Sequence, residues 1–460
     1  MREYCHHMRT FPITGRIKRF ASVFRDNGYS LFVVGGAVRD FLLGLGNSDL
    51  DFTTDARPEE VIALFRTVIP TGIAHGTVTV IFEGEHYEVT TFRSEGEYKD
   101  GRRPSSVTFI PSLEEDLKRR DFTINAFAAS AITGKIIDNH NGEQDLKDGT
   151  IRAIGNPYER FDEDALRIMR AARISGKLNF TIEDQTFNAM GALKENLRLV
   201  SVERLHDELV HLVKSDHPRK GFEYLHASGA LAVILPELAQ GSGVLQKGFH
   251  HEDVLQHSFT TCQKAADIGS SVHVRLAALF HDIGKTTTRE PNGDRYSFYN
   301  HEIVGEALTK TILRRLKASN EEIDTVSHLV RHHMFSYTPE MTDSAVRRFI
   351  VRVGIEHIEE LFKLRIADQM AISGRADTDL LDEFSKRING IISSDDALSI
   401  KDLAIGGNDL LALGIPKGKR IGQTLQYLLE TVLDDPAQNT KEQLFRIALA
   451  YQELCGFTSD

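Results

Sequence analysis

The stretch from Leu31 to Thr54, LFVVGGAVRDFLLGLGNSDLDFTT, restricts the possible folds more than any other part of the chain. It opens with four apolar residues before two glycines, which is typical of a buried strand that enters a tight turn. Apolar residues then recur at helical spacing over 37–43. Because glycine lets a phosphate approach the main chain and a helix start carries partial positive charge, we predict a triphosphate cradle of Gly35, Gly36 and Arg39.

Asp49 and Asp51 follow this turn in a second short predicted strand. Residues two apart on a strand point to the same face, so the two carboxylates converge. Convergent carboxylates repel each other unless cations lie between them, and Mg²⁺ binds one or two carboxylates together with substrate phosphate oxygens. An isolated Asp-X-Asp is usually a solvated turn, but its position after the glycines favours a catalytic Mg²⁺ site. Glu88 is either a third acidic group beside the pair or an outward-facing strand residue.

Composition limits the class of protein. The chain has 460 residues, 41% hydrophobic and 26% charged, which predicts a globular chain with several cores. Its net charge of −11 would repel a polyanion, so a nucleic-acid site requires a local concentration of Arg and Lys. The scattered Cys5, Cys262 and Cys455 predict free thiols in a reducing compartment. With no apolar run of signal-peptide or membrane-span length, we predict a cytoplasmic location and no membrane partner.

The segments after the Asp pair predict further small elements of the same domain. We expect a helix at 58–68, a strand pair at 77–82 and 86–92, and a mobile polar loop at 93–107. The sequence RRDFTINAFA at 119–128 predicts an apolar helix that opens with two arginines and an aspartate. Arginine forks suit phosphate and ribose oxygens, although pairing with the acidic run at 114–116 is the alternative.

Beyond Gly155 the pattern becomes helical almost to the end of the chain, and its first helix carries ERFDEDALRIMRAARISGKL. Asp164 and Arg167 are helical neighbours at i and i+3, whereas Arg173 lies half a turn round, so we expect Asp164 and Arg173 not to share one patch. Cytosine and adenine both present an amino donor beside a ring acceptor. An Asp acceptor beside an Arg donor fits that edge; a surface ion pair is the alternative.

Residues with metal-ligand character recur between residues 250 and 373. Any one of them alone is most often packed or on the surface, but imidazoles and carboxylates in this order are typical of metal ligands. They are His257, His281, Asp282, His301, His332 or His333, and Asp368. We therefore predict a second metal site.

Four segments together resemble the successive motifs of class II nucleotidyltransferases, and within them the bacterial CCA-adding enzymes. They are GGAVRDFLLG…SDLDFTT, RRDFTINA, RFDEDALRIMRAAR and, at 201–209, SVERLHDEL. The resemblance covers roughly the first half of the chain. It implies an α+β fold, in which a polymerase-β-like nucleotidyltransferase head with a small mixed sheet precedes an all-α neck, body, HD domain and tail. The implied boundaries are 1–155 for the head, 156–249 for the neck and body, 250–373 for the HD domain and 374–460 for the tail.

The resemblance also implies roles for individual residues. Asp49 and Asp51 would hold Mg²⁺, and Asp164 and Arg167 would read the base of ATP or CTP. The nucleotide-binding set that we predict is Gly35, Gly36, Arg39, Arg120, Asp121, Glu163, Asp164, Arg167, Arg170 and Arg173. The expected RNA partner is tRNA, and the expected assembly is a monomer or homodimer. The loop at 93–107 resembles the element that helps full CCA enzymes switch from C to A.

The second metal site resembles that of the HD phosphohydrolases. His257, His281, Asp282 and Asp368 match their basic ligand set, and His301 with His333, favoured over His332 by its place next to Met334, could add a second ion. A divalent metal of unspecified identity would generate hydroxide to attack a phosphoester, such as a 2′,3′-cyclic phosphate at a damaged RNA end.

Several alternatives stay open from sequence. An enzyme that adds only A, only CC or a poly(A) tail would share every catalytic residue named. A protein of another class, an HD phosphohydrolase with a degenerate RNA-binding head, is disfavoured by the intact Asp pair. In the tail, Lys417, Lys419 and Arg420 either contact the phosphates of the tRNA elbow or form a solvated basic turn.

Overall fold

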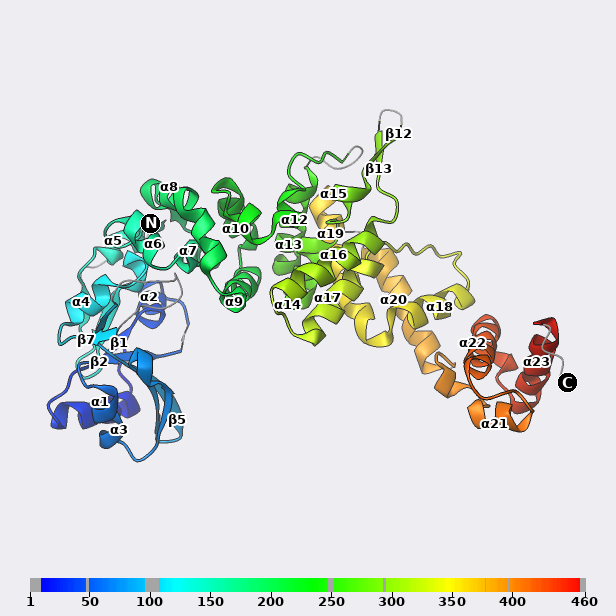
Figure 1. Ribbon diagram of the computed structural model, residues 1–460, viewed down its shortest axis with the longest axis horizontal. Coiled ribbons are helices and arrows are strands. Elements are labelled where there is room, and N and C mark those ends of the chain that lie inside the picture. Colours follow the sequence, from blue (N-terminus) through cyan, green and yellow to red (C-terminus); the bar gives the residue numbers. More distant parts are fainter. Residues whose placement is uncertain are drawn as a thin grey trace. The chain divides into compact units, whose positions relative to one another are not determined.

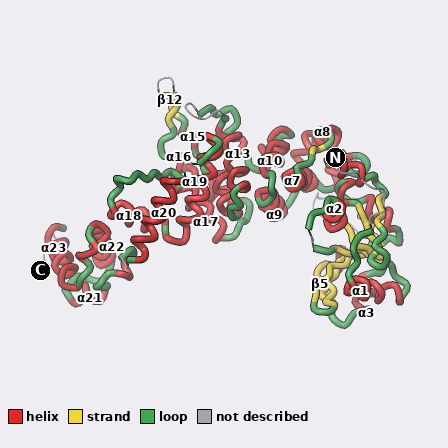
Figure 2. The backbone as a smooth tube through the Cα atoms, turned by 180° about the vertical axis from the view of Figure 1, so that it is seen from behind, coloured by secondary structure: helices red, strands yellow, loops and turns green. Residues whose placement is uncertain are grey.

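The computed structural model describes residues 10–46, 49–95, 107–246, 252–292, 295–376, 378–394 and 397–455. The chain forms two compact units: unit 1 comprises residues 1–240 with 314–318, and unit 2 comprises residues 241–313 with 319–460. Figures 1 and 2 show strands gathered in the first part of unit 1, whereas helices dominate the rest of both units. The predicted α+β fold, with a mixed sheet in the head and a helical remainder, is confirmed.

A seven-stranded mixed sheet forms the frame of unit 1. In spatial order its strands are β3 (Val68–Gly72), β4 (Thr77–Phe82), β5 (Glu85–Thr91), β2 (Asp51–Thr54), β1 (Leu31–Val34), β8 (Phe127–Ser130) and β9 (Ile136–Asp138). Strands β2 and β5 run parallel, and the other neighbouring pairs run antiparallel. The register places Asp51 opposite both Val34 and Glu88. The residue before the two glycines, an aspartate of the predicted pair and Glu88 therefore meet in the middle of the sheet, where β1 ends and β2 begins.

Aromatic packing fixes one face of this sheet. Helix α1 (Gly15–Asp26) buries the apolar stripe that its helical spacing predicts, and its Phe20 ring lies 5.4 Å from Phe52 and 4.7 Å from Tyr87. Phe52 follows Asp51 in the chain, and Tyr87 precedes Glu88. Because successive strand residues alternate between faces, the buried aromatic rings direct Asp51 and Glu88 to the opposite face.

The other elements of unit 1 are mostly short helices. They are α2 (Gly36–Leu42), α3 (Pro58–Leu64), β6 (Arg93–Glu95), β7 (Val107–Phe109), α4 (Leu113–Lys118), α5 (Gly142–Asp148), β10 (Thr150–Ile151), α6 (Pro157–Glu163), α7 (Leu166–Leu178), β11 (Thr181–Ile182), α8 (Asp184–Leu193), α9 (Val202–Val213), α10 (Pro218–Ala227), α11 (Ala230–Ile234) and α12 (Pro236–Ala239). The helix expected at 58–68 thus ends at Leu64, and β3 begins at Val68. The parallel pair β10 and β11 links segments on either side of Gly155.

The prediction of a helix at 119–128 is wrong. A short 3₁₀ turn at Thr123–Asn125 leads instead into strand β8, which pairs with β1 on one side and β9 on the other. Phe127, Ala128 and Ala129 are fully buried. A strand that is covered on both faces reads as a continuous apolar run, and periodicity does not distinguish such a run from a buried helix.

The single helix expected over 159–178 is also wrong, because it is broken between α6 and α7. Asp164 has φ −147° and ψ 100°, and its Oδ1 accepts a hydrogen bond from the backbone N–H of Leu166 at 3.1 Å. An aspartate that bonds its own backbone in this way competes with the helix. Asp164 therefore lies outside the helix that carries Arg167 and Arg173. The expected separation of Asp164 from Arg173 assumed that all three lie on one helix.

Unit 2 is helical except for one hairpin. Its elements are α13 (Val254–Asp267), α14 (Val272–Phe280), α15 (Lys285–Thr288), β12 (Glu290–Asn292), β13 (Arg295–Ser297), α16 (His301–Arg315), α17 (Asn320–His332), α18 (Asp343–Val353), α19 (Ile355–Ser373), α20 (Thr378–Ser393), α21 (Gly407–Ala412), α22 (Lys419–Asp434) and α23 (Lys441–Leu454). The last two residues of α16 belong to unit 1. Residues 397–448 have a separate apolar cluster that includes Leu428, Val432 and Leu444.

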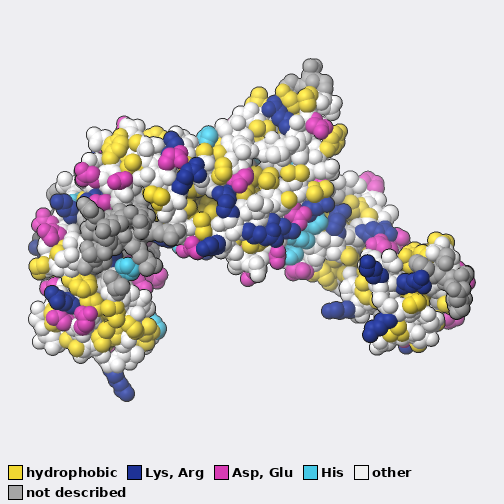
Figure 3. All heavy atoms as spheres, in the orientation of Figure 1, with side chains coloured by type: hydrophobic (Ala, Val, Ile, Leu, Met, Phe, Trp, Pro, Cys, Tyr) yellow, Lys and Arg dark blue, Asp and Glu magenta, His cyan; other side chains and the backbone are white. Residues whose placement is uncertain are grey.

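Surface and membrane features agree with the composition. On the face seen in Figure 3, Lys and Arg side chains lie in small groups among acidic ones, as expected for a net charge of −11. Across the described ranges, every helix is too short or too polar to cross a lipid bilayer. Cys262 is buried and Cys455 exposed, and both are free thiols. Cys5 lies outside the described residues.

Candidate functional site

The glycine corner after β1 opens onto a cavity of about 600 Å³. Gly35 has φ +70°, a backbone conformation that favours glycine, and a Cβ atom there would lie 3.3 Å from Arg120 Nη1. Gly36 begins helix α2 beside it. Arg39 lines the same cavity, but its buried guanidinium already donates to Asn125 Oδ1 at 2.6 Å and to Asp40 Oδ1 at 2.8 Å. These contacts fix the corner and limit how Arg39 can meet a ligand.

Acidic side chains line this cavity on the side of strands β2 and β5. Asp51 is the first residue of β2, and Glu88 lies opposite it on β5 and lines the same cavity, so Glu88 is the third acidic group beside the pair. Asp49 precedes the strand rather than lying in it, and its charge still acts on Asp51. Loss of solvent around the carboxylate and the neighbouring charge of Glu88 raise the pKa of Asp51. A cation between these groups would offset that repulsion.

Arginine side chains form the opposite wall. Those that line the cavity besides Arg39 are Arg93, Arg119, Arg120, Arg167, Arg170, Arg173 and Arg204. Buried donors in this wall that have no hydrogen-bond partner among the described residues include Arg120 Nε and Arg204 Nη1. A buried donor without a partner is costly, so the wall fits an anionic ligand that would accept from it. A triphosphate has both the charge and the acceptor oxygens.

The break between α6 and α7 brings Asp164 into the same wall as the arginines. Asp164, Arg167, Arg170 and Arg173 all line the cavity, so the expectation that Asp164 and Arg173 do not share one patch is wrong. Positions three apart on α7 form a stripe, and the Asp164 side chain reaches this stripe from outside the helix. Arg204 Nη2 donates to Asp164 Oδ2 at 2.8 Å, while Arg167 Nη1 donates to Glu163 Oε2 at 2.8 Å.

Ion pairs hold the remaining arginines of the stripe. Arg170 Nη2 lies 2.6 Å from Asp121 Oδ2, and Arg173 Nε donates to Glu208 Oε2 at 2.6 Å. Burial alone would raise the pKa of Asp121, but the charge of Arg170 and a hydrogen bond from Asn125 outweigh it and hold that pKa well below its usual range. Asp121 is thus an anion that positions Arg170.

Sequence reasoning did not identify several residues of this cavity. Arg204 lines it from α9, within the motif at 201–209, and pairs with the distant Asp164. Glu208 of the same helix does not line the cavity itself, but it holds Arg173, which does. Asn125 and Arg93 also line the cavity without having been predicted, whereas Arg119 is one of the two arginines that the run at 119–128 indicated. The motif at 201–209 was the available signal, but without the fold nothing linked it to particular partners. Most of the expected loop, residues 96–106, lies outside the described residues.

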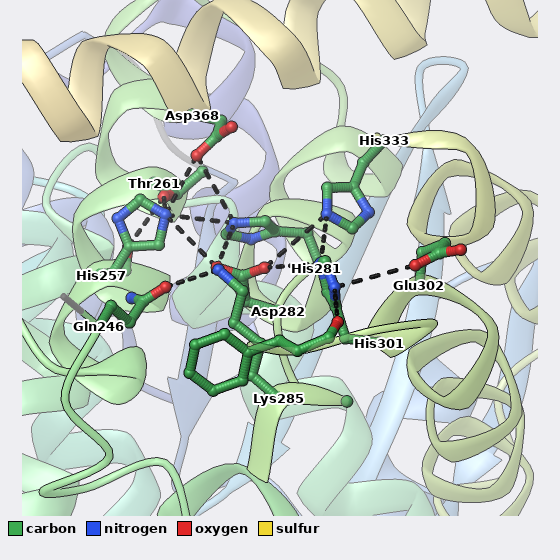
Figure 4. Close-up of polar contacts among 12 residues, drawn as sticks. Gln246, His257, Thr261, His281, Asp282, Lys285, His301, Glu302, His333 and Asp368 are labelled. Atoms are coloured by element: carbon green, nitrogen blue, oxygen red, sulfur yellow. Dashed lines mark hydrogen bonds and ion pairs between the residues drawn. The ribbon is translucent and has the colours of Figure 1, made fainter. Parts of the chain in front are cut away.

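The second predicted group of metal ligands comes together in unit 2 (Figure 4). One set consists of His257, His281 and Asp282, and the other of Asp282, His301 and His333; within each set the ligand atoms lie within 4.8 Å of one another. Asp282 is common to both, as in a carboxylate that bridges two ions. Asp368 Oδ1 lies 3.1 Å from His257 Nε2 and adds a second carboxylate. His332 is not in either set; its ring packs 4.5 Å from His328 instead.

Backbone contacts fix the tautomers of three of these histidines. The Nδ1 atoms of His281, His301 and His333 lie 2.9, 2.9 and 2.7 Å from the carbonyl oxygens of Ala278, Phe298 and Val330. A carbonyl accepts only, so each Nδ1 carries a hydrogen and each Nε2 faces inward, where it presents a lone pair whenever the ring is neutral. His301 Nε2 and His333 Nε2 then face each other at 3.3 Å, and His281 Nε2 lies 3.2 Å from His257 Nε2. In neutral His301 and His333, lone pairs at that separation repel unless a cation or a proton lies between them.

The surroundings of Asp282 and Asp368 lower the pKa of both carboxylates and so favour their ionised forms. Burial opposes ionisation of Asp282, but the charges of His281 and Lys285 outweigh it and hold its pKa well below the usual range. Lys285 Nζ lies 2.7 Å from Asp282 Oδ2 and donates also to Gln246 Oε1 (Figure 4). A cavity of about 460 Å³ opens beside the cluster and is lined also by Tyr299, Met334 and Arg365. The donor set of imidazoles and carboxylates, with space for a substrate, fits a metal-dependent hydrolase.

Known proteins share this architecture. The family described as "Poly A polymerase head domain" matches residues 31–152, the "RNA and SrmB- binding site of polymerase A" matches 179–241, and "tRNA nucleotidyltransferase domain 2" matches 299–448. The CCA-adding enzyme of Lactobacillus helveticus is 34% identical over 91% of this chain and 92% of its own length. That of Enterococcus faecalis is 33% identical over 96% and 98%. The crystal structure of the Bacillus stearothermophilus CCA-adding enzyme in complex with CTP superposes with a TM-score of 0.74 at 27% identity, covering 96% of this chain and 98% of that one.

Proposed function

This chain belongs to the family of CCA-adding enzymes, and from that premise we propose that Asp49 and Asp51 carry its nucleotidyltransferase activity. The enzyme adds C, C and A from CTP and ATP to the 3′ end of tRNA. In each addition the 3′ oxygen of the RNA forms a bond to the α-phosphorus of the nucleotide, the bond from that phosphorus to the bridging oxygen breaks, and pyrophosphate leaves. The observation that carries the assignment is that Asp51 and Glu88, on neighbouring strands, line the same cavity as the arginines.

Transferases of this class use divalent metal ions, and we propose Mg²⁺ as the ion. When bound, Mg²⁺ supplies positive charge that lowers the pKa of the attacking hydroxyl and stabilises the leaving pyrophosphate. Asp49, Asp51 and Glu88 would hold it, because carboxylate oxygens are the ligands that hard cations prefer. The guanidinium groups of Arg120 and Arg170 would bind the phosphate oxygens, and the backbone at Gly35 and Gly36 admits them closely.

Base selection is assigned to Asp164 and Arg167. Cytosine and adenine share a donor beside an acceptor on the Watson–Crick edge, whereas guanine and uracil present the reverse order. A carboxylate has about four lone-pair sites, so Asp164 can still accept from a base while it accepts from Leu166 and Arg204. Arg167 supplies the matching donor. Glu163 holds the Arg167 guanidinium at 2.8 Å and so orients it.

The product of the reaction separates CCA addition from its relatives. A tRNA that lacks its terminal CCA is incubated with CTP and ATP together, and the extended RNA is sequenced. We expect the product to end in CCA. An extension of A alone, of CC alone or of many A residues would assign the chain to the related A-adding, CC-adding or poly(A)-forming enzymes.

We propose a second activity, hydrolysis of a phosphoester by a divalent metal centre at the histidine cluster of unit 2. The Nε2 atoms of His281 and His301 support it, because each lies 3.3 Å from an oxygen of Asp282 while its Nδ1 is held by the backbone, and imidazole nitrogens gathered around a carboxylate in this way are typical metal ligands. When bound, the metal supplies a nucleophile from water at neutral pH. Lys285 and Arg365 at the cavity would bind the phosphate. The substrate that we propose is an RNA end with a 2′,3′-cyclic phosphate.

Substitution of the cluster tests this second activity. In His281→Ala with Asp282→Ala, we expect loss of bound metal by elemental analysis and of phosphodiesterase turnover, while CCA addition persists. Retained hydrolysis in that variant would show that the activity lies elsewhere.

We place the enzyme in the cytoplasm, since its free thiols suit a reducing compartment.

A further inference from the structure

We propose that a second cavity of unit 1 binds the 3′-terminal nucleotide of the acceptor RNA and that Arg16 binds the phosphate of that nucleotide. The inference rests on the proposed transferase function and assigns a place to its second substrate. It names Arg16 as a positioning residue for the attacking end of the RNA.

The two cavities share one wall. The second cavity, of about 820 Å³, lies where the neighbouring strands β2 and β5 begin, beside the first turn of α1. Asp51 and Glu88 line both cavities. Since a transferase must bring a nucleotide and a hydroxyl to the same metal-binding acids from two directions, two spaces that meet at these acids match its two substrates.

The charges of the two cavities decide which substrate each one takes. Arginines dominate the wall of the first cavity, which suits the several negative charges of a triphosphate. The second cavity is acidic: Asp49, Asp51, Glu85 and Glu88 line it, and among its described lining residues Arg16 is the single Arg or Lys. Such a lining disfavours a triphosphate and leaves one guanidinium for the substrate that brings fewer negative charges to the site. The terminal linkage of an RNA strand carries one such charge, so the acceptor end belongs in the second cavity.

The guanidinium of Arg16 is held at the rim without being buried. Its Nη1 donates to Glu85 Oε1 at 2.6 Å, its Nε lies 3.7 Å from Glu83 Oε2, and its side chain is 43% exposed. A guanidinium has five N–H donors, so the carboxylates orient it and use only part of its capacity. Glu83 also pairs with Arg19, one turn further along α1. Arg19 does not line the cavity among the residues described there, which makes it a matched control.

Kinetics with a short acceptor hairpin that lacks its terminal nucleotides tests the role of Arg16. We expect Arg16→Ala to raise the KM for the acceptor about tenfold, the usual loss for a hydrogen bond to a charged group, with little change in the KM for CTP. Arg16→Lys should restore part of the affinity because it keeps the charge. Arg19→Ala should behave as wild type. The melting temperatures of all variants, measured in the same buffer, would separate a local effect on binding from a loss of folded enzyme.

A neutral phosphate provides the decisive comparison. An acceptor with a methylphosphonate at its last internucleotide linkage loses the single charge that Arg16 would bind. We expect its KM with wild-type enzyme to rise about tenfold, and its KM with Arg16→Ala to show no further rise. The inference is overturned if the modification costs wild type and Arg16→Ala equally. Failure of the wild-type enzyme to extend any acceptor would instead overturn the proposed function itself.

Discussion

Replacement of Arg204 by alanine is expected to weaken the choice of base without removing catalysis. Arg204 reaches Asp164 from α9 at 2.8 Å, and a hydrogen bond of this kind between charged groups contributes about 1.5–3 kcal/mol when buried. Arg204 is 37% exposed and Asp164 15% exposed, so solvent screening reduces the value to about 1 kcal/mol. Since Asp164 would then accept from a base in more than one orientation, we expect the preference for CTP over UTP to fall about fivefold.

The assay compares kcat/KM for CTP and UTP on the same tRNA acceptor. Arg198→Ala is the matched control, because Arg198 lies nearby in sequence but forms an exposed pair with Glu195. The wild-type preference should persist in that control. If Arg204→Ala keeps full discrimination while Asp164→Ala loses it, Asp164 reads the base without help from Arg204. If both variants keep it, base reading does not occur at Asp164.

Three further outcomes follow from individual contacts. Ion pairing with Arg170 holds the pKa of Asp121 below its unfolded value of about 3.9, so Asp121→Asn should lower the free energy of unfolding by about 1–2 kcal/mol at pH 7. The difference from wild type should shrink as the pH falls through the folded pKa of Asp121, and denaturant titrations at several pH values check this. His301→Ala should lose one of two bound metal equivalents in elemental analysis, whereas His332→Ala should lose neither. Burial raises the pKa of Cys262 to about 12, so Cys262→Ala should leave the number of thiols that react with a disulfide reagent at pH 8 unchanged in the folded protein.

Local sequence patterns predicted the elements whose residues meet nearby partners. The strand, glycine turn and helix at 31–42 need only adjacent residues, and the structure has all three. The histidine cluster was also predictable as a set, because imidazoles and carboxylates on neighbouring helices have few other uses in a buried core. His333 rather than His332 enters it, as its position beside Met334 suggested.

The errors arose where tertiary contacts decide local structure. Strand β8 is covered on both faces, so its apolar run gave no alternation to mark it as a strand. At Asp164 a hydrogen bond between the side chain and the nearby backbone breaks a helix that periodicity extends, and this break determines which residues share the arginine-lined cavity. Arg204 reaches the cavity from a distant helix, and Glu208 of that helix holds the cavity residue Arg173; no local rule relates positions that far apart.

The most direct test of the account is nucleotide incorporation by Asp49→Ala with Asp51→Ala. The variant is given CTP, ATP and Mg²⁺ with a tRNA that lacks its terminal CCA, and radiolabelled product is measured in single-turnover conditions. The account predicts a fall in incorporation of about three orders of magnitude or more, since the acids that gather the cations are lost while the arginine wall stays intact. Incorporation at the wild-type rate would show that transfer takes place elsewhere in the chain.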